Sequence, residues 1–209
     1  MHDGTTGTTG SMFREFLRSP GQIGAVAPSS RRLAAEVSLP IPESGDPVVV
    51  ELGPGTGAFT TLIQELLGGR GHHLAVEINP RLAASLATRH PRVTVLHAEA
   101  STLPRLLASY GLGAADVVIS GLPWAVLPLP VQRATLASVH HALSPQGAFT
   151  TFGYVHATRL SPARRFRRML GASFEEVVAG RTVWANLPPA FVYHARRPRP
   201  HPANLLTPA

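Results

Sequence analysis

The segment Val50-Glu51-Leu52-Gly53-Pro54-Gly55-Thr56-Gly57 decides the fold of this chain of 209 residues. Residues 47–52 form a buried-strand pattern that includes one acid, Glu51, and three alternating glycines follow it. Glycine lets the backbone pass close beside a ligand without a side-chain clash. In open parallel sheets, ligands bind at the carboxyl ends of the strands, where such a loop lies. The segment therefore predicts a strand that leads into a ligand-binding turn.

The alternation of strand and helix patterns continues after this turn. Strand patterns cover residues 47–52, 72–77, 92–97, 116–120 and 147–154, and helical patterns cover residues 59–67, 81–89, 103–109 and 130–143. Residues 173–183 and 191–197 are typical of a closing antiparallel pair. Strands that alternate with helices form a parallel sheet covered by helices. We therefore expect an α/β fold of the Rossmann-like type.

The N-terminal part has a different pattern. Phe13 and Phe16 lie at helical spacing in a short amphipathic segment, and Ser29 and Ser30 are plausible caps for a second helix. The predicted division is a flexible leader or expression remnant over residues 1–11, an N-terminal helical cap over residues 12–46, a main domain over residues 47–197 and a flexible tail over residues 198–209.

The composition indicates a basic globular protein. The formal charge is +7, and all 19 basic residues are arginines because the sequence contains no lysine. Guanidinium groups pair well with phosphate oxygens, so the charge favours nucleic acid or an anionic lipid surface as a partner. A solvated basic surface is the alternative, and charge alone does not choose between them.

Several classes of protein are excluded or disfavoured. The absence of cysteine excludes disulfides and thiolate metal sites, and the ten histidines show no metal-binding spacing, so no metal is expected. No apolar stretch approaches the roughly 20 residues of a membrane-spanning helix. The N-terminus lacks the pattern of a secretory signal, which makes the cytoplasm the expected compartment.

Acidic residues stand at the ends of neighbouring predicted strands. Glu77 ends the second strand pattern, at about the spacing from the glycines at which a carboxylate accepts hydrogen bonds from ribose hydroxyls. Glu99 lies just beyond the third pattern, where it can accept from an adenine amino group. The glycine spacing is GxGxG rather than GxGxxG, which disfavours a dinucleotide. These strand ends together predict a site for one nucleoside.

Residues 50–60 resemble the first motif of class I S-adenosylmethionine-dependent methyltransferases, especially the bacterial phospholipid N-methyltransferases and the rRNA adenine dimethyltransferases. The resemblance implies a seven-stranded sheet with S-adenosylmethionine along its strand ends. The cofactor-binding residues that it implies are Glu51, Gly53, Gly55, Gly57, Glu77, Ile78, Glu99, Ala100, Ser120, Gly121 and Leu122.

The two groups of relatives differ after the fourth strand. The adenine-N6 enzymes carry an Asn or Asp there to hold the target amine and a Tyr or Phe to stack on the base. This chain has Ser120-Gly121-Leu122-Pro123-Trp124, in which Trp124 can stack but Gly121 has no side-chain acceptor. Residues 120–123, 16–30 and 184–193 are similar to the phospholipid enzymes. The resemblance thus implies methylation of a phosphatidylethanolamine-like headgroup amine, with an RNA adenine or a small molecule as the alternative acceptor.

Basic amphipathic segments fit a lipid acceptor. Arginines in residues 159–168 interleave with apolar residues near the expected active site. Such segments bind peripherally to anionic lipid. Packing of the first helix, a solvated helix face and RNA binding are the alternatives. We expect an anionic membrane as partner, at the inner face of the cell membrane, and no obligate protein partner. The expected substrate or membrane contacts are Phe13, Phe16, Ser29, Trp124, Arg164 and Arg165.

The expected catalytic residues lie at the ends of two strand patterns. Methyl transfer needs a neutral amine held in line with the methyl group, whereas a headgroup amine arrives protonated. Tyr154 and His156 follow the fifth strand pattern, and Ser120 ends the fourth. We predict that these residues contact the headgroup or relay its proton.

Overall fold

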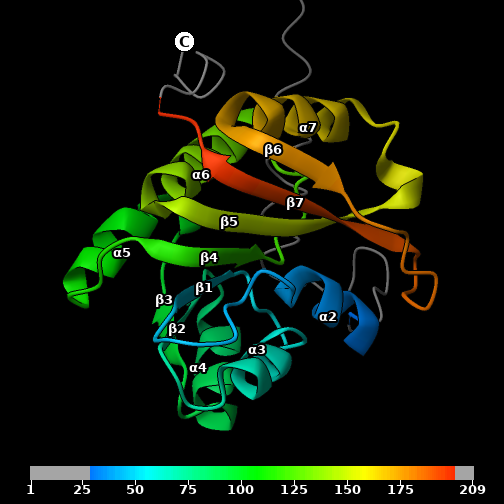
Figure 1. Cartoon of the computed structure of the whole chain (residues 1–209). Coiled ribbons are helices and arrows are strands. Elements are labelled where there is room, and N and C mark those ends of the chain that lie inside the picture. The colour runs from blue at the N-terminus through cyan, green and yellow to red at the C-terminus, as the bar shows by residue number, and fades with distance from the viewer. Residues whose placement is uncertain (1–28, 201–209) are drawn as a thin grey trace, which may run out of the picture.

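The computed structural model describes residues 29–200, which form a central sheet with helices on both faces (Figure 1). The seven strands lie in the order β3-β2-β1-β4-β5-β7-β6. The strands are β1 (Val48–Leu52), β2 (His72–Glu77), β3 (Thr94–His97), β4 (Ala115–Ser120), β5 (Leu143–Tyr154), β6 (Phe174–Ala179) and β7 (Ala190–Pro198). Strands β1 to β5 pair in parallel, and β7 is antiparallel to both of its neighbours. The predicted seven-stranded, mostly parallel sheet is confirmed.

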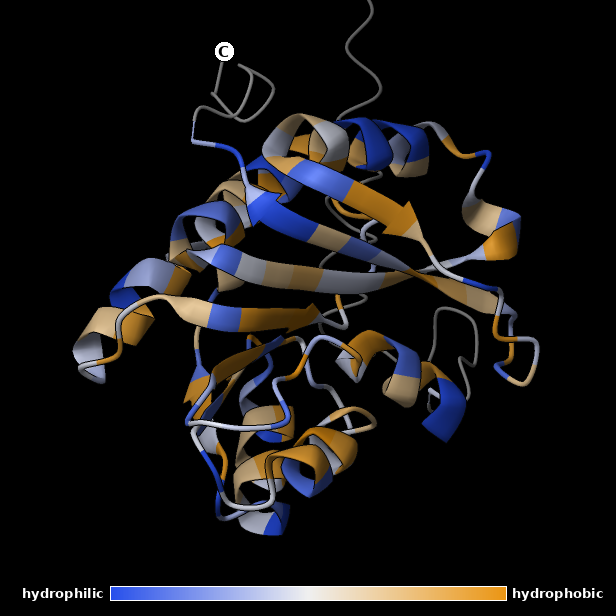
Figure 2. Ribbon diagram, viewed as in Figure 1, coloured by the Kyte–Doolittle hydropathy of each residue, from blue (hydrophilic) through white to orange (hydrophobic). Residues whose placement is uncertain are grey.

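The helices divide between the two faces of the sheet. They are α2 (Arg31–Ser38), α3 (Thr60–Leu67), α4 (Pro80–Arg89), α5 (Leu103–Ser109), α6 (Leu129–Ala142) and α7 (Ser161–Ser173), with 3-10 turns η1 (Ala100–Thr102) and η2 (Val155–Ala157). Apolar residues of α5, α6 and α7 pack on one face with Val50 and Val118, whereas those of α2 and α3 pack on the other with Val49 and Val117. Alternate residues of β1 and β4 thus serve opposite faces, as the pleat requires. Figure 2 shows β4 as mostly hydrophobic.

The described part of the predicted N-terminal cap belongs to this core. Ser30 caps α2 by accepting a hydrogen bond from the Leu33 amide at 3.2 Å. Leu33 and Val37 are fully buried against α3 and the sheet. Thr150 on β5 donates to the Val37 carbonyl at 2.7 Å. The helix is therefore fixed to the sheet, while the predicted boundary at residue 46 stays a prediction.

Most predicted elements are observed within a few residues of their expected bounds. The largest differences are in β5 and β6. β5 begins at Leu143 rather than at residue 147, because Leu143 pairs with Ala115 ahead of a register shift. β6 ends at Ala179 rather than at residue 183, and Val183 makes only an isolated bridge to Ala190. Within residues 29–200, none of the helices has the length and apolarity to cross a membrane.

Candidate active site

The strand ends predicted to form the site do meet at one edge of the sheet. Leu52 at the end of β1 is in register with Ser120 at the end of β4. The Gly53 amide donates to the Val76 carbonyl of β2 at 2.9 Å, and the Gly121 amide donates to the Leu52 carbonyl at 2.8 Å. The loops after β1 and β4 are therefore each held against the end of the neighbouring strand by a backbone hydrogen bond.

The three glycines adopt the backbone conformation that their spacing indicates. Gly53, Gly55 and Gly57 have φ angles of +67°, +56° and +87°, in the left-handed region that side chains disfavour. A Cβ on Gly55 would meet no protein atom within 4 Å, so the loop presents bare backbone to open space. At Gly55, therefore, no side chain separates the loop backbone from a ligand, whereas Leu122 and Leu86 lie against Gly53 and Gly57.

Glu77 is held against this loop. Its Oε2 accepts from the Gly55 amide at 3.0 Å, and its Oε1 accepts from the Asn79 amide at 2.9 Å. The residue is 6% exposed. Each carboxylate oxygen has two lone pairs, so each keeps one for a further donor. The geometry therefore suits a ribose diol, which offers two adjacent hydroxyl donors.

The remaining predicted nucleoside contacts follow β2 and β3. The Ala98 amide donates to the Glu77 carbonyl at 3.2 Å, which brings the end of β3 beside that of β2. Glu99 is exposed and accepts from the Ser101 hydroxyl at 3.3 Å. Ile78 and Ala100 are half-buried beside these two acids. Their roles as cofactor contacts stay predictions.

Gly121 has a structural role that the sequence did not reveal. A Cβ at this position would lie 2.5 Å from the Gly53 carbonyl oxygen. In turn, a Cβ on Gly53 would lie 2.7 Å from Cδ2 of Leu122. The loop after β4 therefore packs directly onto the glycine turn, and the position equivalent to the adenine-orienting Asn has no room for a side chain.

Trp124 requires a correction. It was predicted to contact substrate, but it is 3% exposed and stacks on Phe166 of α7 at a centroid distance of 4.2 Å and an interplanar angle of 16°. Phe149 meets it edge-on at 6.1 Å. Its indole Nε1 donates to the Ser120 hydroxyl at 3.1 Å. The ring is a core side chain, because its aromatic faces pack within the protein.

Ser120 lies beneath the same turn. It is fully buried, and its hydroxyl also accepts from the Leu122 amide at 3.3 Å. Its carbonyl accepts from the Thr151 hydroxyl at 3.1 Å. The contacts shown are those of a residue that positions the loop, while its catalytic role stays a prediction.

Glu51 takes part in a buried polar network below the glycine turn. It is fully buried, and its Oε2 accepts from the Thr60 hydroxyl at 2.7 Å. The same oxygen lies 3.3 Å from His73 Nε2. Gln64 Nε2 lies 2.9 Å from His73 Nδ1. Glu51 thus supports the loop from within, and its predicted cofactor contact is untested.

Tyr154 and His156 lie at the end of β5. Their rings stack at a centroid distance of 5.6 Å and an interplanar angle of 15°. Burial raises the pKa of the Tyr154 phenol above its usual value. The phenol is therefore protonated at neutral pH and can donate a hydrogen bond to a headgroup. His156 is exposed, so its ring is open to a substrate or to water.

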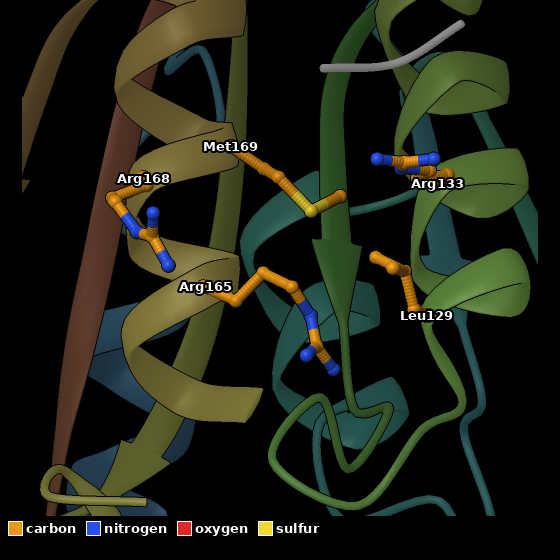
Figure 3. Close-up of a pocket in the computed structure, with 5 residues that line it drawn as sticks. All are labelled: Leu129, Arg133, Arg165, Arg168 and Met169. Atoms are coloured by element: carbon orange, nitrogen blue, oxygen red, sulfur yellow. The ribbon is translucent and has the colours of Figure 1, made fainter. Parts of the chain in front are cut away.

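Except for Arg159, which lies in the turn before the helix, the predicted arginine cluster lies on α7, whose first half is strongly hydrophilic in Figure 2. Arg164 is exposed, and Arg165 donates from Nε to Gln132 Oε1 on α6 at 3.4 Å. A groove between α6 and α7 has an apolar and basic lining (Figure 3), formed by Leu129, Arg133, Arg165, Arg168 and Met169. Gln132 also donates to the Trp124 carbonyl, which connects this groove to the loop after β4.

One further residue was missed by sequence reasoning. Asn186, in the loop between β6 and β7, is 2% exposed and accepts at Oδ1 from the Ser30 amide at 2.9 Å. This bond joins segments 156 residues apart, so no local sequence pattern indicates it.

Ser29, which was predicted to contact substrate or membrane, is half-buried next to Ser30. Phe13 and Phe16 lie outside the described residues. Within residues 29–200 there is no cluster of metal-binding side chains.

Fold and site together define a Rossmann-like protein that binds a nucleoside cofactor at its strand ends. A family model described as a methyltransferase domain matches residues 49–147. An ornithine lipid N-methyltransferase of Singulisphaera acidiphila is 30% identical over 185 residues, which cover 87% of this chain and 92% of that protein. The chain therefore belongs to the S-adenosylmethionine-dependent methyltransferases. It is an enzyme of this class, and its cofactor is S-adenosylmethionine.

Solved structures show the same fold. An O-methyltransferase from Bacillus cereus in complex with S-adenosylhomocysteine matches with a TM-score of 0.63 and 13% identity, over 90% of each chain. The 1,6-didemethyltoxoflavin-N1-methyltransferase from Burkholderia thailandensis, also with S-adenosylhomocysteine, matches with a TM-score of 0.62 and 22% identity, over 90% of this chain and 86% of that one. At these identities the likeness concerns the fold alone.

Proposed function

We propose that this enzyme transfers methyl groups to the amine of a membrane lipid headgroup, of the phosphatidylethanolamine kind, at the membrane surface. The observation that carries the proposal is the likeness to a lipid N-methyltransferase over 87% of the chain. That relative's name specifies an ornithine lipid, which also presents a primary amine. The shared chemistry is a lipid-linked primary amine, and the experiment must separate the two headgroups.

The site offers what such a transfer needs. When bound, S-adenosylmethionine supplies an electrophilic methyl group on a cationic sulfur. Glu77 and the glycine turn hold the nucleoside, and the loop of Gly121 and Leu122 closes beside it. The headgroup amine must lose a proton before it can attack. In our proposal Tyr154 hydrogen-bonds the headgroup, and His156 or water accepts the proton.

The location proposed for the enzyme is the inner face of the cytoplasmic membrane, with peripheral attachment. Support comes from the formal charge of +7 and from the arginines of α7. Arginines near an anionic surface each contribute on the order of 1 kcal/mol of binding free energy. A small number of them is therefore sufficient for reversible association.

An RNA adenine or a small molecule is the alternative acceptor. Gly121 has no room for the side chain that orients an adenine amine, and the ring of Trp124 is buried. Both features count against a base, because a flipped base needs a hydrogen-bond acceptor and an open stacking face.

A labelled-methyl assay tests the proposal. The enzyme is incubated with labelled S-adenosylmethionine and, in parallel, with phosphatidylethanolamine vesicles, ornithine lipid vesicles, RNA and small amines. We expect label in one or both lipids. Label only in RNA or in a small amine would refute the lipid proposal. The absence of label from both lipids, in an enzyme that binds the cofactor tightly, would also refute it.

A further inference from the structure

The loop between β6 and β7 displays the two most exposed large apolar side chains of the described residues. Trp184 is 73% exposed and Leu187 is 70% exposed. They lie three positions apart in a loop that runs from Gly180 to Pro189. Exposed tryptophan and leucine in such proximity indicate a surface that meets an apolar or interfacial partner.

This loop lies beside the candidate active site. Ala190, the first residue of β7, is in register with Tyr154, the last residue of β5. The Val155 amide donates to the Pro189 carbonyl at 3.0 Å. In Figure 1 the loop stands at the same end of the sheet as the connection from β5 to α7. A surface that receives this loop therefore also approaches the end of β5.

The base of the loop is fixed, although its apolar side chains are exposed. Asn186 lies between Trp184 and Leu187 and is 2% exposed. Its Oδ1 accepts from the Ser30 amide at 2.9 Å, and its Nδ2 donates to the Pro188 carbonyl at 2.8 Å. The protein thus buries a polar side chain at this point and leaves the two apolar neighbours outside, which is the reverse of ordinary loop burial.

The chain around the loop is mainly basic, although Glu36 of α2 lies close enough to His194 of β7 to influence its pKa. Residues 117–174 contain no Asp or Glu, and both carboxylates that follow them pair with Arg197. Arg159, Arg164 and Arg181 are exposed, and none of the three pairs with a carboxylate in the part of the chain that the structure describes. A partner of complementary charge is therefore anionic.

We propose that the loop between β6 and β7 inserts into the interface of an anionic bilayer. Trp184 and Leu187 enter the region between headgroups and acyl chains, where tryptophan is favoured, and Arg159, Arg164 and Arg181 meet lipid phosphates. The inference rests on the proposed function, since it brings the lipid headgroup to the end of β5. It goes further by assigning the docking residues.

Fluorescence provides the first test. The chain has two tryptophans, and Trp124 is buried, so a change of environment at the surface is reported by Trp184. Vesicles of phosphatidylglycerol and phosphatidylcholine should shift the emission to shorter wavelength, and Trp184→Phe should remove most of that shift. An unchanged wild-type spectrum overturns the proposal. If the emission shifts with protein concentration and not with added vesicles, the proposal is also overturned, because a second copy of the chain then covers the loop.

Vesicle sedimentation provides the second test, with matched control residues outside the loop between β6 and β7. Tyr110 follows α5 and is 51% exposed, and Leu66 near the end of α3 is 46% exposed. Trp184→Ala and Leu187→Glu should each reduce the vesicle partition coefficient by about tenfold, as loss of one buried apolar side chain predicts. Tyr110→Ala and Leu66→Glu should leave it unchanged. Equal partition of loop variants and wild type overturns the inference.

Binding measured without turnover separates this inference from the proposed function. Partition is measured without cofactor, and methyl transfer is also measured on a dispersed short-chain lipid amine. Loop variants that lose activity on vesicles and keep it on the dispersed amine support insertion. Wild-type activity of these variants on vesicles refutes insertion alone. Absence of any lipid methylation, with vesicle binding that still depends on Trp184, refutes the proposed function alone.

Discussion

Replacement of Gly121 by alanine is the sharpest test of how the site is built. The added Cβ would lie 2.5 Å from the Gly53 carbonyl oxygen, and real Cβ atoms essentially never approach another heavy atom within 3.0 Å. Neither Gly121 nor the Gly53 carbonyl can move away easily, because both residues are held by backbone hydrogen bonds. The Gly121 amide is bonded to the Leu52 carbonyl, and the Gly53 amide is bonded to the Val76 carbonyl.

The size of the effect follows from this geometry. Overpacking against a fixed backbone costs about 1–3 kcal/mol of unfolding free energy. In a domain of this size, each kcal/mol lowers Tm by about 2–4 °C, so Gly121→Ala should lower Tm by about 2–12 °C. Because Gly53 must move, affinity for S-adenosylmethionine should fall by about tenfold, which corresponds to about 1.4 kcal/mol.

Calorimetry and thermal unfolding measure both quantities, with Gly113→Ala as the matched control. Gly113 has an ordinary φ, and a Cβ there would meet nothing within 4 Å. That variant should stay within about 0.5 kcal/mol of wild type. Wild-type Tm and cofactor affinity in Gly121→Ala would refute the claim that the loop after β4 packs on the glycine turn. Gly121→Asn should likewise lose cofactor affinity and should not confer methylation of RNA.

Three further perturbations address other parts of the molecule. Glu77→Gln should weaken S-adenosylmethionine binding by about tenfold to hundredfold in calorimetry, since hydrogen bonds to a charged group contribute about 1.5–3 kcal/mol; unchanged affinity would contradict its ribose role. Thr60→Val removes the donor to the buried Glu51 carboxylate and should cost about 1–3 kcal/mol in denaturant unfolding, whereas Thr61→Val on the exposed face of α3 should not. Burial lowers the pKa of His140, so the unfolded chain binds a proton more readily than the folded chain, and the free energy of unfolding should fall as pH drops below about 6.5. His140→Gln should make the urea midpoint less dependent on pH. If the midpoint of this variant changes with pH as much as that of the wild type, the role of His140 is refuted.

The fold was predictable wherever local pattern and tertiary packing agree. The strand over residues 72–77 and the helix over residues 103–109 have the predicted bounds, because their apolar positions mark both their type and their ends. β5 begins four residues earlier than predicted. The polar segment Ser144-Pro145-Gln146 suggests a turn, whereas Leu143 pairs with a strand that is distant in sequence.

The site was predictable where backbone conformation or strand order dictates the residue. Gly55 needs a positive φ, and Glu77 ends the neighbouring strand, so both follow from the sequence. Trp124 was predicted wrongly because its burial depends on Phe166, which comes from a helix 42 positions further along the chain. The role of Asn186 depends on a contact with Ser30 in the same way. Long-range contacts of this kind leave no local signal.

These corrections also bear on the choice of acceptor. An adenine needs an amide oxygen at position 121 and an open aromatic face at position 124, and here the first is sterically blocked and the second is packed on Phe166. In our proposal a lipid amine needs neither contact, because the bilayer orients the headgroup while the enzyme is docked. Acceptor specificity is therefore supplied, in this proposal, by Trp184 and the exposed arginines Arg159, Arg164 and Arg181, which are here called the rim. It follows that rim variants should raise the apparent KM for vesicles and leave kcat unchanged, whereas variants of the glycine turn should lose cofactor affinity with any acceptor.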